Sequence, residues 1–224
     1  MVTQSDCDGV HSVISAKRFQ PFLEKCEGDR AAAERLCAWD GEAARALWSP
    51  VRDLEVSFRN AAHRQLAGKW GQAWWVARQP NSWGQGEIEA AREKLVRRRR
   101  PDSPDDIVAQ LSFGFWVSLL SNGNRQGFYR TWYWSPSLQY LFPEYRGRRD
   151  KLHDQFGRMQ TLRNRIAHHE RIFQRHLEED YRTAMHLLRL VAPGLADQHD
   201  KYGQVPEVLA RRAAVVTGRE PIRL

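Results

Sequence analysis

The stretch SPVRDLEVSFRNAAHRQLAGK, residues 49–69, indicates the fold class of this chain. Its apolar residues recur at steps of three and four, the spacing that gathers side chains on one face of an α-helix. This apolar stripe consists of Leu54, Phe58, Ala61, Ala62 and Leu66. Ser49 followed by Pro50 is typical of a helix start, because serine caps a helix and proline suits its first turn. The stretch therefore predicts a helix over 49–69 with one buried face.

The same spacing extends in both directions along the chain, while the alternating patterns of strands are scarce. Asp29 is expected to cap the start of another helix, which precedes the stretch 49–69 and runs to about Trp48 unless Asp40-Gly41 interrupts it. The other expected helices cover about 15–27, 87–100, 103–120, 146–170 and 177–191. The sequence therefore predicts an all-α fold.

Three segments lack this periodicity. Residues 70–86 are rich in Gly, Gln, Asn, Pro and Trp, which is typical of a long connection between helices. Residues 1–16 are expected to form an N-terminal arm, and 17–192 the helical domain. Residues 193–224 are expected to form a C-terminal peripheral arm, because they contain Gly203, Pro206, Gly218 and Pro221.

The composition is that of a basic globular domain. The chain has 224 residues, with 35 Lys and Arg against 27 Asp and Glu, and a formal charge of +8. No apolar run approaches the roughly 18–20 residues that span a bilayer. The first twenty residues carry Asp6, Asp8 and His11 where a secretory signal is apolar. We therefore expect a cytoplasmic protein with no membrane partner, whose charge favours an acidic partner such as nucleic acid.

Metal and cofactor motifs are missing from the sequence. The cysteines are odd in number and lack CxxC spacing, which predicts reduced thiols rather than disulfides or a zinc site; they are Cys7, Cys26 and Cys37. His168-His169-Glu170 does not extend to His-Glu-x-x-His, and adjacent histidines point about 100° apart on a helix. We therefore expect no metal ion and no cofactor.

The stretch LRNRIAHHERIF, residues 162–173, gathers groups suited to phosphodiester chemistry. Asn164 and His168 lie four residues apart on one face of the expected helix, and Arg163 can reach round with its long stem. An imidazole accepts a 2′-hydroxyl proton near neutral pH, and a guanidinium stabilises charge that builds on the phosphorus oxygens. By residue type alone, the stretch also fits a solvated basic helix face.

Arg163, Asn164 and His168 match the R-x(4–6)-H signature of HEPN ribonucleases, with Asn164 at the usual polar second position. The chain resembles the Abi-like (abortive infection) proteins of bacteria, a branch of the HEPN superfamily. The segments that carry the likeness are LEVSFRN at 54–60, LSFGFWVSLL at 111–120, and 162–170. The likeness extends over roughly residues 17–192.

The resemblance implies a HEPN-like helical bundle with additional helices that dimerises, so that two Arg163/His168 turns form one composite cleft. It further implies a metal-independent endoribonuclease that acts in phage defence or in a toxin-antitoxin system and leaves 2′,3′-cyclic phosphate ends. The expected partners are RNA, a second copy of the chain, and an antitoxin protein or a regulatory RNA. Because the fold class includes members that bind RNA without cutting it, a non-catalytic RNA-binding module that holds a regulatory RNA is the alternative. A purely protein-binding member of a toxin-antitoxin pair is a third interpretation.

Further residues are candidates for a supporting role. His169 is a candidate helper, and Glu170 fits an acid that orients a neighbouring Arg or His. Arg59, Asn60 and His63 form a similar group with one intervening residue too few. For this group we favour a structural role, in which Arg59 or Asn60 hydrogen-bonds the facing helix. In the functional alternative, the group lines the same cleft as Arg163 and His168.

Basic and aromatic clusters are candidates for RNA contact. The arginines expected to bind phosphate are Arg97, Arg98, Arg99, Arg100, Arg158, Arg165 and Arg171. The run 97–100 equally fits a solvated helix end, which attracts cations through the helix dipole. Aromatic residues within 70–83 and 128–134 could stack on unpaired bases, or could belong to the core or a dimer interface.

Overall fold

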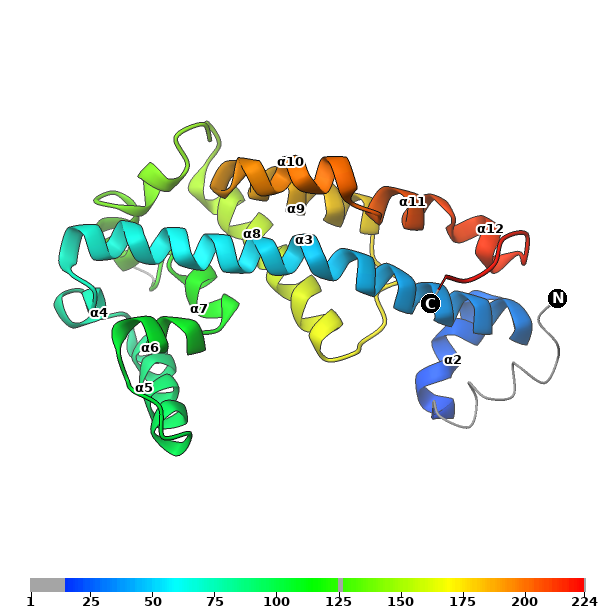
Figure 1. The fold of residues 1–224 in the computed structure, drawn as a ribbon, viewed down its shortest axis with the longest axis horizontal. Helices are drawn as coiled ribbons and strands as arrows, with labels where there is room; N and C mark the ends of the chain where they lie inside the picture. Colours follow the sequence, from blue (N-terminus) through cyan, green and yellow to red (C-terminus); the bar gives the residue numbers. More distant parts are fainter. Residues whose placement is uncertain (1–14, 125–126, 224) are drawn as a thin grey trace.

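A computed structural model describes residues 15–124 and 127–223 of the chain. These residues form helices joined by loops, and no strand occurs within the two described ranges. The expected all-α class is confirmed. Figure 1 shows an elongated molecule in which the other helices are arranged along one long helix, α3 (Arg30–Trp70).

Helix α3 is continuous over 41 residues, where the sequence predicts two helices that meet at Pro50. An internal proline costs a helix about 3 kcal/mol, because it removes a backbone hydrogen bond and crowds the preceding turn. Leu47, Val51 and Leu54 around it are fully buried, and each such side chain contributes about 1.5–3 kcal/mol. Burial of one uninterrupted apolar face therefore outweighs the proline, and Asp40-Gly41 does not break the helix either.

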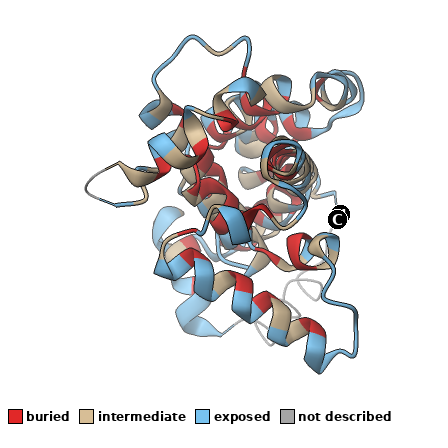
Figure 2. Cartoon of the chain, turned by 90° about the vertical axis from the view of Figure 1, so that its left-hand side faces the viewer, coloured by how far each residue is buried: buried red, intermediate tan, exposed pale blue. Residues whose placement is uncertain are grey.

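Helices that come before and after α3 in the chain pack on it. Helix α2 (Ala16–Lys25) lies at its N-terminal end, where the rings of Phe22 and Phe173 are 4.7 Å apart. Helices α8 (Arg149–Ala167) and α9 (Leu177–Val191) also pack on α3, and the ring of Phe58 in α3 lies 4.3 Å from that of Phe156 in α8. In Figure 2 the buried residues, drawn in red, gather in the interior between the helices.

The middle of the chain is more helical than its composition suggests. Residues 70–86 contain α4 (Trp74–Ala77) and the start of α5 (Ser82–Arg97), so the expected long, partly ordered connection is shorter and more helical than predicted. The physical reason is local, because the Asn81 side chain accepts a hydrogen bond from the backbone N–H of Gly84 and caps α5. Trp74, at the start of α4, is fully buried.

The apolar stretch 103–120 forms two short helices, α6 (Pro104–Gln110) and α7 (Phe113–Ser118), rather than one. The predicted start at Ser103 and Pro104 is confirmed. A second serine, Ser112, caps α7 by accepting from the N–H of Phe115. A π-helical turn, η1 (Arg130–Trp134), and a 3-10 turn, η2 (Leu138–Leu141), follow and were not expected.

The C-terminal segment contributes to the core. Its described part, 193–223, forms α10 (Pro193–Tyr202), α11 (Val205–Ala210) and α12 (Arg212–Val216), which lie along α3 and α9 (Figure 1). Val215 is fully buried, and Arg211 is paired with Glu42 of α3 at 2.7 Å. The expectation of a peripheral arm is therefore wrong for these residues. The expected N-terminal arm lies outside the described residues except for its last two positions.

Candidate functional site

Helix α8 ends at Ala167, three residues earlier than expected. His168 is the capping residue, and His169 has a positive φ of 56°. The N–H of His169 donates to the carbonyl of Ile166, and the N–H of Glu170 donates to the carbonyl of Arg165. These two bonds define a Schellman turn, so His168 and His169 project from a helix terminus and not from the helix face that the sequence predicts.

Asp40 of α3 hydrogen-bonds the segment that follows this turn. One carboxylate oxygen of Asp40 accepts hydrogen bonds from the backbone N–H groups of Ile172 and Phe173, at 2.9 and 2.6 Å. Burial raises the pKa of Asp40 from its usual 3.8 to about 6, against the lowering effect of these N–H groups and of nearby arginines. Asp40 therefore fixes where the turn at 168–170 sits over α3.

Arg163 is held by a carboxylate of the facing helix. Its Nε lies 2.8 Å from one oxygen of Glu55, and a terminal nitrogen lies 3.4 Å from the other. The Arg163 side chain keeps 31% of its surface exposed, against 15% for Glu55. Sequence reasoning did not identify Glu55 as a site residue, because nothing in the local spacing indicates a partner 108 positions away.

Asn164, in the last turn of α8, and His168, its capping residue, are both exposed. Within residues 15–124 and 127–223, neither side chain forms a hydrogen bond or an ion pair. Exposed groups of this kind need no internal partner, because water satisfies them. Both are therefore available to an external ligand, whereas Arg163 already contacts Glu55.

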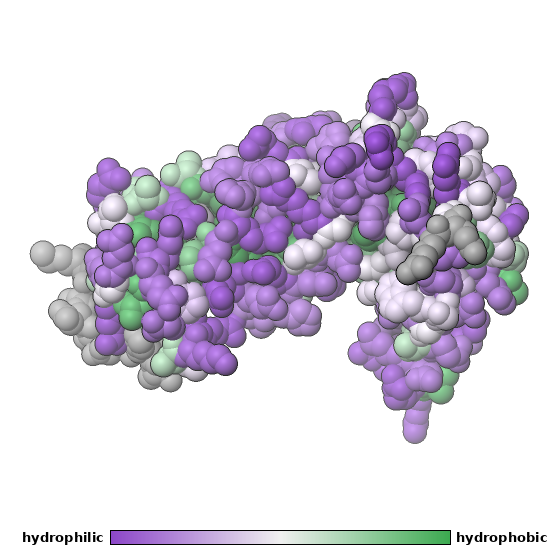
Figure 3. Space-filling view, turned by 180° about the vertical axis from the view of Figure 1, so that it is seen from behind, coloured by the Kyte–Doolittle hydropathy of each residue, from purple (hydrophilic) through white to green (hydrophobic). Residues whose placement is uncertain are grey.

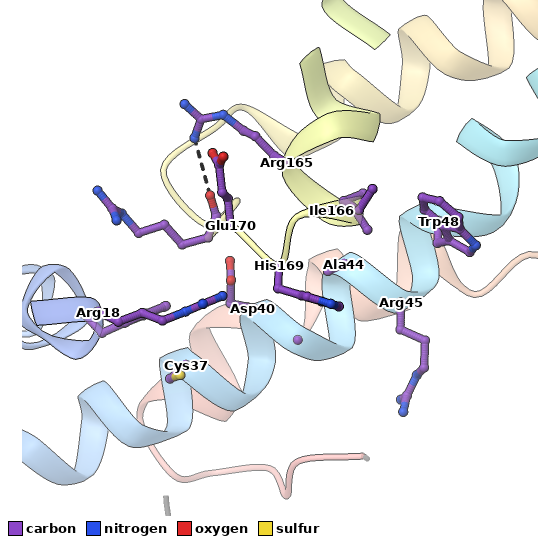
Figure 4. A pocket seen from close by; sticks show the side chains of 14 residues that line it. Arg18, Cys37, Asp40, Ala44, Arg45, Trp48, Arg165, Ile166, His169 and Glu170 are labelled. Atoms are coloured by element: carbon purple, nitrogen blue, oxygen red, sulfur yellow. Dashed lines mark hydrogen bonds between the residues drawn. The ribbon is translucent and has the colours of Figure 1, made fainter. Parts of the chain in front are cut away.

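A pocket of about 890 Å³ opens beside the turn, between α2, α3 and the end of α8. In Figure 4, Arg18 comes from α2, Asp40, Ala44 and Trp48 lie along α3, and Arg165, His169 and Glu170 belong to the end of α8. The pocket brings together four sequence-predicted site residues: Arg165, His169, Glu170 and Arg171. The signature residues Arg163, Asn164 and His168 do not line it.

The group on α3 lies outside this pocket. Arg59 donates to Asn60 of its own helix at 3.2 Å, and not to a facing helix. His63 is 7% exposed, with its Nε2 3.2 Å from the Gln72 side-chain oxygen and 3.8 Å from a carboxylate oxygen of Asp105. Burial lowers the pKa of His63. These contacts indicate that His63 has a packing role where α3 meets the segments that follow it.

The predicted phosphate-binding arginines lie in three separate environments. Arg97 is the last residue of α5, and residues 98–100 follow it. Figure 1 shows this end of α5 apart from the end of α8. Arg97 pairs with Glu93, and Arg100 pairs with Asp106. Arg158 is paired with Glu179 and with fully buried Asp180. Arg165 and Arg171 line the pocket. The charge of Arg158 is therefore largely neutralised within the fold.

Most aromatic side chains within residues 70–83 and 128–134 belong to the hydrophobic core or pack against it. Trp74, Tyr129 and Tyr133 are fully buried. The guanidinium of Arg78 lies over the rings of Trp70 and Trp132, at 5.3 and 5.1 Å from their centroids. Trp83 differs, because 48% of it is exposed. The buried rings are therefore unavailable for stacking on bases.

Hydrophilic side chains cover most of the face drawn in Figure 3. Within the described ranges, no set of three or more His, Cys, Asp or Glu side chains is arranged to hold a metal ion. Cys26 and Cys37 are free thiols, and Cys7 lies outside the described residues. None of the described helices is both long and apolar enough to cross a bilayer.

No known family model, curated protein or solved structure matches this chain at a significant level. Two features stand out: the exposed Asn164 and His168 beside Arg163, and the basic pocket that other residues of the same turn line.

Proposed function

We propose that this chain is a metal-independent endoribonuclease of the HEPN type that acts as an effector in phage defence or in a toxin-antitoxin system. The observation that carries the proposal is the end of α8, where the side chains of Asn164 and His168 are exposed next to Arg163 and have no partner among the described residues. The resemblance of 162–170 to the HEPN signature supplies the reaction type. The overall charge of +8 favours RNA as the substrate.

The chemistry follows from these side chains. His168 accepts the proton of the RNA 2′-hydroxyl, whose oxygen attacks the adjacent phosphorus. Arg163 stabilises the negative charge on the phosphorus oxygens, and the Asn164 amide donates a further hydrogen bond to them. The bond from phosphorus to the 5′-oxygen then breaks, and that oxygen takes up a proton. The products are a 2′,3′-cyclic phosphate and a 5′-hydroxyl.

A second copy of the chain would complete this site. General acid-base cleavage uses one group to remove the 2′-proton and another to protonate the leaving oxygen, and each chain supplies one His168. A two-fold dimer that joins two α8 ends would place both histidines at one cleft. Such an effector requires an inhibitor, for which an antitoxin protein or a regulatory RNA is proposed.

One contact favours the non-catalytic alternative. Arg163 forms a two-point ion pair with Glu55, and a guanidinium used in this way has less capacity to hold a phosphate. A module that binds RNA through the pocket arginines, without cleaving it, would need no free Arg163. The two functions differ in one measurement, which is cleavage.

Cleavage of single-stranded RNA by the purified protein tests the proposal. We expect cleavage that persists in EDTA, leaves cyclic phosphates and fails when the nucleotide at the cut site carries a 2′-O-methyl group. Arg163→Ala and His168→Ala should each lower the rate by about 10² or more, the scale of losing an acid-base group or a charge stabiliser. Glu170→Ala should have a smaller effect.

His186→Ala is the matched control, because His186 is an exposed histidine on α9 outside this site. Its rate should equal that of the wild type. Circular dichroism of every variant checks that the helices persist. Full activity in His168→Ala would overturn the assignment, whereas RNA binding without cleavage by the wild type would establish the binding module instead.

A further inference from the structure

The pocket between α2, α3 and the end of α8 has a cationic lining that the chain does not neutralise. Its four arginines are Arg18, Arg45, Arg165 and Arg171. Among the residues that the structure describes, none of these four forms an ion pair with a carboxylate. Three of them donate instead to neutral oxygens: Arg45 to the carbonyl of Arg223, Arg165 to the carbonyl of Arg171, and Arg171 to the side chain of Gln174.

The acids in the pocket do not balance these charges. Four arginines face two carboxylates, those of Asp40 and Glu170, so the lining keeps a surplus of two positive charges. Asp40 is 8% exposed, and one of its oxygens already accepts two backbone N–H groups. Because these guanidinium groups outnumber the carboxylates that line the pocket with them, the surplus positive charge would attract an anion.

The other half of the lining is apolar and contains a flat ring. Phe22, Ala44, Trp48 and Ile166 contribute to the wall, and Trp48 is half-buried. In Figure 4, Trp48 and Ile166 lie together at one end, and Arg18 and Asp40 lie toward the other. A ligand that spans the pocket would therefore meet an aromatic surface at one end and a cation at the other.

A glycine keeps this space open. Gly41 lines the pocket from the interior of α3, and a Cβ built on it would meet no atom within 4 Å. Glycine inside a helix costs about 1 kcal/mol relative to alanine. The fold would therefore gain stability from a side chain at position 41, and that side chain would occupy the pocket.

From these observations we infer that the pocket binds a nucleotide, whose phosphate lies on the arginines and whose base lies against Trp48. Arginine binds phosphate with paired hydrogen bonds, and aromatic rings stack on bases of any sequence. The volume of about 890 Å³ lies within the range of small-molecule sites. This site goes beyond the proposed function, because the signature residues do not line it. The nucleotide is either free or one unit of an RNA chain, and binding measurements separate the two sources.

Isothermal titration calorimetry of the full chain at low salt tests the inference. The probes are the four nucleoside monophosphates, the matching nucleosides, inorganic phosphate, and a trinucleotide with 2′-O-methyl groups that resists cleavage. We expect at least one monophosphate or the trinucleotide to bind about tenfold more tightly than the nucleoside or phosphate alone, since both halves of the pocket then contribute. Binding of the monophosphate identifies a free nucleotide as the ligand, and binding of the trinucleotide alone identifies a unit of RNA.

Two variants with matched controls place the binding in the pocket. Gly41→Phe should lower the affinity about tenfold or more by filling the space, whereas Gly68→Phe should not. Gly68 lies exposed in the same helix with equally open surroundings, and it does not line the pocket. Arg18→Ala should lower the affinity to a similar degree, and Lys17→Ala, its exposed neighbour on α2, should not.

Arg18→Ala alters only an exposed side chain, so it keeps the test valid if Gly41→Phe fails to fold. The inference is overturned if no nucleotide or oligonucleotide binds at millimolar concentration, or if both variants bind as well as their controls. RNA cleavage that is insensitive to His168→Ala would contradict the proposed function, but would leave this binding result unchanged.

Discussion

His169 occupies a backbone conformation that glycine adopts more readily, with φ at 56° in the Schellman turn that ends α8. Arg99, which follows α5, has the same conformation, with φ at 53°. A side chain in this region costs of order 1 kcal/mol. His169 also lines the pocket, whereas Arg99 does not. The chain therefore keeps a strained histidine at the place where ligand contact is proposed.

We expect His169→Gly to raise the free energy of unfolding by about 1 kcal/mol, because it removes the Cβ from a left-handed position. Urea unfolding measures this change. Arg99→Gly is the matched control and should stabilise the protein to a similar extent. Only His169→Gly should also weaken nucleotide binding. A loss of stability in both variants would show that neither turn carries strain.

At the scale of elements, Asp40 joins α3 to the chain that leaves α8. Its pKa in the folded protein is about 6, above the usual 3.8, so between these values the folded state binds more protons than the unfolded state. Stability therefore falls as pH rises from about 4 to 6, and the contribution of the protonated form is lost above that range. A shift of about two pKa units corresponds to about 3 kcal/mol.

Asp40→Asn isolates this contribution. An amide oxygen can still accept the N–H groups of Ile172 and Phe173, but the side chain no longer titrates. We expect the variant to match the wild type near pH 4 and to be more stable by up to about 3 kcal/mol near pH 8. Urea unfolding at the two pH values measures the difference, and an identical gain at both values would contradict it.

At the scale of the whole molecule, α3 sets the length of the protein. Its 41 residues span about 60 Å, with α2 at one end and α4 at the other. The end of α8 lies part-way along this length and carries an exposed His168. A single chain therefore presents one such turn to solvent, which is half of the cleft that the proposed function requires.

The protein should be a dimer in solution if two α8 ends form the cleft. Light scattering should give a mass of about 52 kDa, twice the 26.1 kDa of one chain. At low protein concentration the rate of RNA cleavage per chain should fall as dimers dissociate. A mass of 26.1 kDa at concentrations where cleavage is fully active would contradict the composite cleft.

The sequence by itself determined the features that depend on one or two helical turns. The periodic apolar residues predicted the all-α class, and α9 has the bounds 177–191 that this pattern indicates. The start of α6 at Ser103 and Pro104 was predicted in the same way, because a cap acts on the next three residues. A helix that carries Arg163 and Asn164 was also predicted, although the Schellman turn that ends it at Ala167 was not.

Only the tertiary structure decided the continuity of α3, the packing of 193–223, and the partners of the site residues. The α3 helix runs through Pro50 because its buried face meets other helices on both sides of that residue. The ion pair of Arg163 with Glu55, and the pocket that both Arg18 and Arg165 line, join segments more than 100 residues apart. Burial and ion pairing depend on neighbours in space, and the spacing of residues along the chain does not record which neighbours those will be.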